Sequence, residues 1–155
     1  MRLLVIAASA RLPDWINAGF AEYAGRLTRD YRLELKEIAL GQRGSGGTAQ
    51  AIAKEGAKML AALPQGAYVV AMQVGGRSMS SEQLAQFLQA RARDGRDVAF
   101  CIGGPEGIAP EVDAKADFKW SLSALTLPHA LARVVLAEAL YRAVTIIQGH
   151  PYHRA

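Results

Sequence analysis

The sequence predicts an α/β fold in which a mostly parallel β-sheet is flanked by helices. Three observations carry this prediction: short apolar runs alternate with longer amphipathic segments, glycine clusters separate several of them, and 155 residues suit one core. Such alternation is typical of βα units, whose strands lie parallel. We therefore expect a single domain over residues 1–155.

The amino-terminal part of the chain alternates strand and helix twice. Residues 2–7 predict a strand, and the continuous apolar run that follows Arg2 is typical of a strand buried on both faces. Pro13 suits the first turn of a helix over residues 13–27. A strand over residues 32–39 and a helix over residues 48–63 follow.

The same pattern continues towards the carboxyl terminus. Ser80 lies three residues before Gln83, a spacing that predicts a capping box at the start of the third helix. Gly75-Gly76-Arg77 predicts a loop before that helix. The predicted elements are a strand over 67–73, a helix over 81–93, a strand over 97–102, a short helix over 111–116 and a strand over 118–121.

The last predicted helix, residues 129–148, is apolar around much of its circumference. A helix of this kind must be covered on more than one side, either as a central core helix or at a contact between subunits. Gly149 ends the helix as a C′ residue, and Pro151 prevents its continuation.

Charge balance, cysteine content and hydropathy limit the classes of function that this protein can have. Lys and Arg number 18 against 14 Asp and Glu, a mild excess that is compatible with a polyanionic partner and too small to establish one. Cys101 has no partner in the chain, no apolar stretch is long enough for a membrane span, and the first residues do not predict a signal peptide. We expect a soluble, cytoplasmic protein without contact to a membrane.

Two loops are candidates for ligand binding. Gly103-Gly104-Pro105-Glu106-Gly107 directly follows a predicted strand, where glycines allow backbone N–H groups to approach a ligand closely; a tight turn is the alternative. Residues 121–129 alternate small hydroxyls with Leu and offer main-chain contacts in an apolar lining. Ser123 or Thr126 could instead cap the last helix.

The carboxyl-terminal residues combine groups that RNA-binding proteins use. His150-Pro151-Tyr152-His153-Arg154 contains two imidazoles, a phenol and a guanidinium, although a frayed tail is the simpler interpretation. His150 and His153 lack a nearby acid or thiolate, so no metal site is expected. In the preceding helix, Glu138 and Arg142 are spaced for an ion pair that Arg133 could join, within a site or as a structural network.

Four ordered motifs in the carboxyl-terminal half closely resemble one family, the small SPOUT-class rRNA methyltransferases of the RlmH type. Its members are 23S rRNA (pseudouridine-N3) methyltransferases, and the likeness runs essentially from end to end. The motifs are Ile102-Gly103-Gly104-Pro105-Glu106-Gly107, Trp120-Ser121-Leu122-Ser123-Ala124-Leu125-Thr126-Leu127-Pro128-His129, Leu140-Tyr141-Arg142-Ala143 and His150-Pro151-Tyr152-His153.

The resemblance implies a fold and a cofactor that periodicity alone does not predict. By this resemblance, the fold is expected to have a deep trefoil knot near its carboxyl end, and the protein is expected to be a homodimer with the last helix at the interface. The cofactor is S-adenosylmethionine, the methyl donor, and no metal is needed. The residues that match its binding positions are Met72, Gly103, Leu122, Ser123, Ala124, Leu125, Thr126 and Leu127.

The reaction that the resemblance implies is methylation of N3 of a pseudouridine in helix 69 of 23S rRNA, within the assembled ribosome. We expect Tyr152 to stack on or shape the substrate pocket, His153 to assist removal of the N3 proton and Arg154 to bind phosphate, with Glu138 and Arg142 in support. Two alternatives are a ribosome- or RNA-binding protein without catalytic activity and a SPOUT methyltransferase with a different RNA target.

Overall fold

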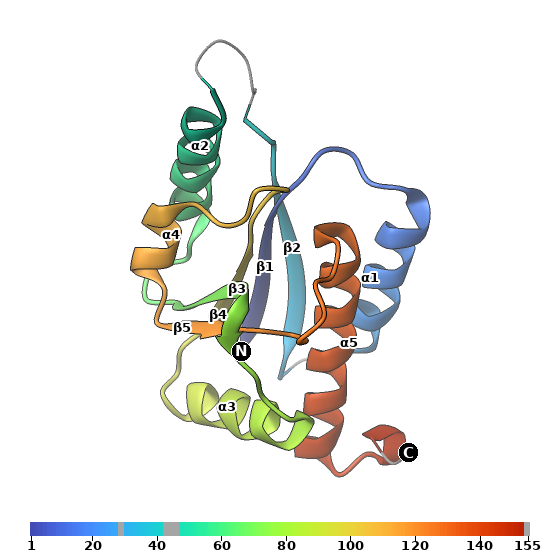
Figure 1. Ribbon diagram of the computed structural model, residues 1–155. Helices are drawn as coiled ribbons and strands as arrows, with labels where there is room; N and C mark the ends of the chain where they lie inside the picture. Colours follow the sequence, from blue (N-terminus) through green and yellow to red (C-terminus); the bar gives the residue numbers. More distant parts are fainter. Residues whose placement is uncertain (28–29, 42–46, 154–155) are drawn as a thin grey trace.

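A five-stranded sheet forms the centre of the computed structural model, which describes residues 1–27, 30–41 and 47–153 (Figure 1). The strand order is β2-β1-β4-β3-β5, and each neighbouring pair is parallel. This confirms the predicted α/β class. The strands are β1 (Arg2–Ala8), β2 (Arg32–Ile38), β3 (Tyr68–Arg77), β4 (Val98–Ile102) and β5 (Phe118–Trp120).

Helices cover both faces of the sheet. On one face α5 (His129–Gln148) packs against α1 (Asp14–Arg26) and α3 (Ser81–Arg93), as Figure 1 shows. On the other face α2 (Gly47–Ala62) packs against α4 (Pro110–Lys115). The 3₁₀ helix η1 (Pro151–His153) follows α5. Among the described residues, no helix is long and apolar enough to cross a membrane.

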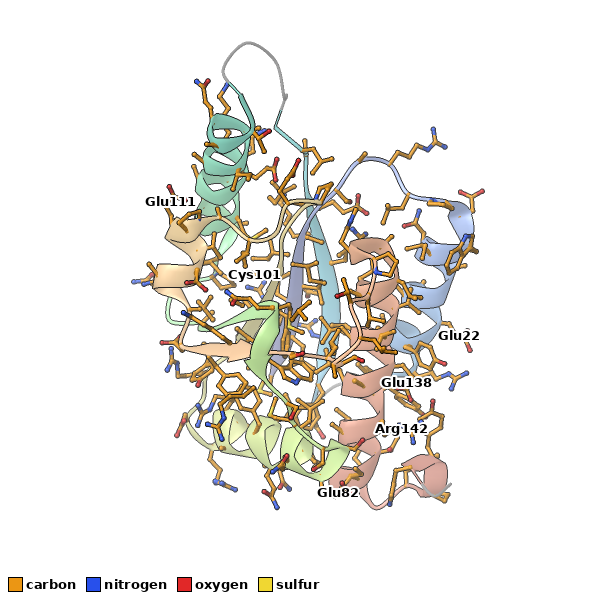
Figure 2. All side chains as sticks on the ribbon, in the orientation of Figure 1. Glu22, Glu82, Cys101, Glu111, Glu138 and Arg142 are labelled. Carbon is orange, nitrogen blue, oxygen red and sulfur yellow. The ribbon has the colours of Figure 1, made fainter. Side chains whose placement is uncertain are left out.

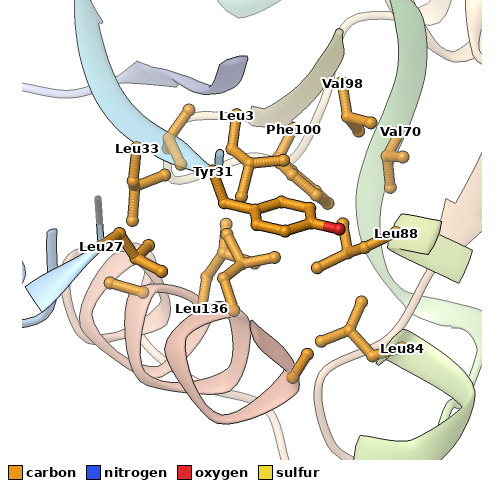
Figure 3. Close-up of a cluster of buried hydrophobic side chains, with 14 of the residues drawn as sticks. Leu3, Leu27, Tyr31, Leu33, Val70, Leu84, Leu88, Val98, Phe100 and Leu136 are labelled. Atoms are coloured by element: carbon orange, nitrogen blue, oxygen red, sulfur yellow. The ribbon is translucent and has the colours of Figure 1, made fainter. Parts of the chain in front are cut away.

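Strand β1 shows why the sheet is buried on both sides. Successive side chains of a strand point to opposite faces, and in β1 both sets are apolar. Leu3, Val5 and Ala7 join the larger core beneath α1, α3 and α5, where Tyr31, Phe100 and Leu136 also lie (Figure 3). The alternate side chains Leu4, Ile6 and Ala8 join the smaller core beneath α2 and α4.

Helix ends follow the predicted signals closely. The Ser80 hydroxyl accepts a hydrogen bond from the Gln83 N–H (3.1 Å), and the Gln83 side chain accepts one from the Ser80 N–H (2.8 Å), so the capping box is confirmed. Gly149 ends α5 with a left-handed φ of 71°, also as predicted. Helix α1 begins at Asp14, one residue later than predicted, so Pro13 is its N-cap and does not lie within its first turn.

The predicted loop at Gly75-Gly76-Arg77 is wrong, because β3 continues through Arg77. The register shifts there, so that both Met72 and Arg77 are partners of Trp120. Gly76 makes this close pairing feasible, since a Cβ at that position would lie only 2.8 Å from backbone atoms of Lys119 and Trp120. Of the two glycines that predicted a loop, Gly76 therefore serves a close approach of two strands.

Helix α5 buries one side and leaves other apolar side chains half-covered. Leu136, Leu140 and Val144 are buried in the larger core. In contrast, Leu131 and Val135 are only half-buried. The helix therefore covers one face of the sheet and retains an apolar surface of its own.

Candidate functional site

A cleft of about 800 Å³ lies at the carboxyl ends of β3, β4 and β5. In open parallel sheets ligands bind at this edge. Three segments line the cleft, within residues 72–74, 102–113 and 120–132. They include both loops that the sequence predicts to bind a ligand.

Most of the residues predicted to hold the cofactor line this cleft. Ala124 is the exception: it belongs to the same loop and is exposed, but it is not part of the lining. The predicted residues that do line it are Met72, Gly103, Leu122, Ser123, Leu125, Thr126 and Leu127.

The loop after β4 presents backbone to the cleft because side chains do not fit there. A Cβ on Gly103 would lie 2.4 Å from the carbonyl carbon and oxygen of Gly107. The Gly107 N–H donates to the Gly104 carbonyl (3.0 Å), and Gly107 has a φ of 96°. The loop is thus both a tight turn and a wall of the cleft, so the two interpretations of this motif coincide.

The loop before α5 is stabilised by its own hydroxyls. The Ser121 hydroxyl donates to the Ser123 carbonyl (2.8 Å), and the Ser123 hydroxyl accepts from the Leu125 N–H (2.9 Å). Helix capping by Ser123 or Thr126 is wrong: Pro128 is the N-cap of α5 and makes no side-chain cap. Ser123 therefore shapes the wall of the cleft, and Leu125, 74% exposed, lies at its rim.

Sequence reasoning missed two polar residues of the cleft, Gln73 and Asp113. The Gln73 amide donates to one carboxylate oxygen of Asp113, and Lys119 Nζ donates to the other at 3.1 Å. These hydrogen bonds, from Lys119 first and Gln73 second, hold the pKa of Asp113 below its usual value. Gln73 and Asp113 are 40 residues apart in sequence, and only the position of Gln73 near a predicted strand end could have indicated this contact.

Three of the predicted catalytic residues lie together at the carboxyl-terminal half of α5, namely Glu138, Arg142 and Tyr152. Arg142 Nε and Nη2 donate to Glu138 Oε1 at 2.9 and 2.7 Å, so the predicted ion pair is confirmed (Figure 2). The Tyr152 hydroxyl donates to the same oxygen at 3.2 Å. The Arg142 guanidinium lies 5.1 Å from the centroid of the Tyr152 ring. The tail therefore folds back onto α5 through Tyr152.

The phenol of Tyr152 is held in its neutral form. Burial of the hydroxyl, followed by the charge of Glu138 and the hydrogen bond to it, raises the pKa of Tyr152 to about 12. At neutral pH this hydroxyl is a hydrogen-bond donor and cannot act as a base.

The remaining tail residues are only partly described. The Tyr152 N–H donates to His150 Nδ1 at 3.1 Å, while His153 Nδ1 is buried and, among the described residues, has no hydrogen-bond partner. Arg154 lies outside the described residues.

Arg133 does not join the Glu138–Arg142 pair, which corrects that prediction. Five residues turn a helix by about 140°, so Arg133 and Glu138 face different ways. Arg133 is fully buried; it donates to the Ser9 hydroxyl at 2.9 Å and to Glu37 Oε1 at 3.3 Å. Desolvation lowers the pKa of this guanidinium.

The cleft and the tail lie at different places in one chain. The last residue of α5 in the lining is Ala132, and Glu138 and Arg142 follow it by about 9 and 15 Å along the helix axis. None of the predicted catalytic residues 138, 142, 152 and 153 is in the lining. Within a single chain, therefore, the described residues do not bring the two predicted parts of the site together.

Comparison with known proteins relates this geometry to a family. Residues 1–153 match the family model described as "Predicted SPOUT methyltransferase". Curated relatives named "Ribosomal RNA large subunit methyltransferase H" are similar over the whole of both chains, with 55% identity in Stenotrophomonas maltophilia (strain K279a) and 53% in Xanthomonas axonopodis pv. citri (strain 306).

A solved structure supports the fold. TrmJ from Z. mobilis ZM4 superposes with a TM-score of 0.50 at 17% identity, covering 92% of this chain and 70% of that one. At this identity the likeness concerns the fold alone. With the family model and the full-length relatives, it shows that the chain belongs to the SPOUT methyltransferase family, among relatives of the RlmH type.

Proposed function

We propose that this protein transfers a methyl group from S-adenosylmethionine to the large-subunit rRNA of the ribosome. The observation that carries the proposal is the cleft at the strand ends, whose lining contains seven of the eight residues matched to cofactor positions. Full-length relatives named large subunit methyltransferases support the rRNA substrate.

The residues of the cleft fit this cofactor. Met72, Leu122 and Leu127 give the lining apolar side chains suited to an adenine ring, and Gly103 keeps the backbone open where a side chain would collide. When bound, S-adenosylmethionine supplies an electrophilic methyl group on a sulfonium. The protein has mainly to position this group and to exclude water.

We propose a homodimer in which the tail of a second copy completes the site. The tail of one chain lies beside Glu138 and outside its own cleft. Leu131 and Val135 leave α5 with a half-buried apolar surface that a second α5 could cover. The deep trefoil knot belongs to the same proposal, and the meeting of residues 102–113 and 120–132 around one cleft is compatible with it.

The proposed acceptor is N3 of a pseudouridine in helix 69 of 23S rRNA, which the assembled ribosome presents in the cytoplasm. The N3–methyl bond forms as the sulfur–methyl bond breaks, and the N3 proton leaves to solvent or to His153. Tyr152 contributes as a neutral stacking and donor group because its pKa is raised to about 12. Arg154 would bind phosphate.

The experiment is transfer of labelled methyl from S-adenosylmethionine to ribosomes that lack the modification, beside protein-free 23S rRNA, with the labelled nucleotide mapped. We expect label on the helix 69 pseudouridine and a strong preference for ribosomes. Label on another nucleotide would identify a SPOUT enzyme with a different target. Failure to bind the cofactor would favour a non-catalytic RNA-binding protein.

A further inference from the structure

We propose that Tyr23 and Arg26 of α1 are positioning residues that hold the carboxyl-terminal tail in the arrangement required for methyl transfer. This inference rests on the proposed function, since it assigns a purpose to the position of the tail. It concerns residues of the first helix, which neither the sequence motifs nor the cleft had indicated.

The tail needs support from outside itself. Its regular part, η1, has three residues and follows the left-handed Gly149. A single 3₁₀ turn has little stability of its own. Side-chain contacts between the tail and the rest of the described chain converge on Tyr152, which meets Glu138, Arg142 and Tyr141.

Aromatic and cationic side chains connect Tyr152 to α1. The ring of Tyr152 meets that of Tyr141 edge-on, with centroids 4.6 Å apart, and the Tyr141 ring lies 6.2 Å from the ring of Tyr23. The Arg26 guanidinium lies over the rings of both Tyr23 and Tyr141. Its central carbon is 5.1 Å from the centroid of the Tyr23 ring and 5.5 Å from that of the Tyr141 ring. Arg26 thus fixes the ring against which Tyr152 packs.

Arg26 is itself oriented by its own helix. Glu22 Oε1 accepts hydrogen bonds from Arg26 Nε at 3.2 Å and Nη2 at 2.7 Å, and this contact raises the pKa of the guanidinium. Glu22 lies on the same helix as its partner (Figure 2). The planar guanidinium is therefore held in a defined place although Arg26 is exposed.

Tyr23 also acts on the tail directly. A hydrogen bond and a charge effect from Tyr23 are among the smaller causes of the raised pKa of Tyr152. Helix α1 therefore supports Tyr152 mainly through the ring of Tyr141, and Tyr23 adds a smaller effect on the phenol. Since His153 follows Tyr152 immediately, a shift of Tyr152 displaces the residue proposed to act on the N3 proton.

The test compares Arg26→Met with Arg93→Met, which removes an exposed arginine from the last turn of α3. For each variant we would measure kcat and KM for ribosomes, cofactor affinity, dimer content and hydrogen exchange of the backbone amides of Gly149, His150, Tyr152 and His153. For Arg26→Met we expect kcat to fall about tenfold and tail exchange to become faster. Cofactor affinity and dimer content should stay at wild-type values, and Arg93→Met should behave as wild type throughout.

Three outcomes would overturn the inference. In the first, Arg26→Met keeps wild-type kcat and wild-type tail exchange. In the second, both variants raise KM equally with kcat unchanged, which would mean that each arginine merely attracts RNA. In the third, Arg26→Met loses the dimer, so that its defect lies in assembly.

Failure of the proposed function is distinguishable from these outcomes. It would appear as a wild-type protein that transfers no methyl in the same assay. The exchange measurement would still decide whether Arg26 holds the tail, because it does not depend on activity. Tyr23→Phe, which removes the hydroxyl and keeps the ring, should speed tail exchange less than Arg26→Met.

Discussion

The buried guanidinium of Arg133 lies 3.3 Å from the carboxylate of Glu37, whose side chain is 47% exposed. The pair joins α5 to the end of β2, and the second contact of Arg133, to Ser9, joins α5 to the end of β1. A charge that is fully buried depends strongly on its partner, whereas a carboxylate near solvent can be hydrated. The two residues should therefore respond unequally to substitution.

We predict that Glu37→Ala destabilises the protein more than Arg133→Met, by about 3–5 against about 1–3 kcal/mol. The first change leaves a buried cation without its counterion, while the second leaves only a Ser9 hydroxyl without its donor. Urea unfolding of both variants would measure this. Glu34→Ala is the matched control on the same strand, since Glu34 pairs with Arg2 near the surface at 3.6 Å and should cost less than about 1 kcal/mol.

Gly103→Val should abolish binding of S-adenosylmethionine. The new side chain would collide with the Gly107 backbone and displace the loop that forms one wall of the cleft. Isothermal titration calorimetry would measure the affinity, with Gly75→Ala as control because a Cβ there meets nothing within 4 Å. Wild-type affinity in Gly103→Val would show that the loop is only a turn.

Removal of residues 151–155 should abolish methyl transfer to ribosomes while cofactor binding stays close to wild type. The reason is that the tail lies outside the cleft of its own chain, so its loss does not alter the lining. Activity is measured by label transfer and binding by calorimetry. Full activity of the shortened chain would contradict a role of the tail in substrate handling.

Tyr152 should make stability depend on alkaline pH. Its pKa is raised from the model-peptide value of about 10 to about 12 in the folded protein, so folding favours the neutral phenol. This contribution is complete below pH 10 and is lost as the pH rises from 10 to 12. The difference in unfolding free energy between wild type and Tyr152→Phe should shrink across that window, as urea titrations at successive pH values would show.

The thiol of Cys101 should be unreactive in the folded protein. Cys101 lies within β4 in the middle of the sheet (Figure 2), and burial raises its pKa to about 12. A thiol reagent at pH 8 should modify it only after unfolding, at a rate set by opening of the core. Rapid modification of native protein would mean that the sheet opens locally around β4.

The sequence predicts those parts of the fold that depend on residues close together in the chain. The continuous apolar run of β1 and the Ser80–Gln83 capping box depend on neighbours within a few residues, and both were predicted correctly. Arg133 was placed wrongly because its partners Ser9 and Glu37 are 124 and 96 residues away. The pairing of Gln73 with Asp113 was missed for the same reason.

The candidate site was predictable where backbone conformation determines it. Gly103 marks a position without room for a side chain, and a glycine in a strand-end loop signals this directly. The place of Tyr152 depends on how the chain end folds back onto α5, which no local pattern encodes.

The strand order has a consequence for synthesis of the chain. β1, made first, lies between β2 and β4, and its second neighbour begins only at Val98. Until that segment leaves the ribosome, β1 presents an unpaired apolar edge, the kind of surface that chaperones cover and that associates with other chains. The cleft forms later still, because its lining extends to Ala132. A nascent chain should therefore be unable to bind the methyl donor until the segment through Ala132 has left the ribosome.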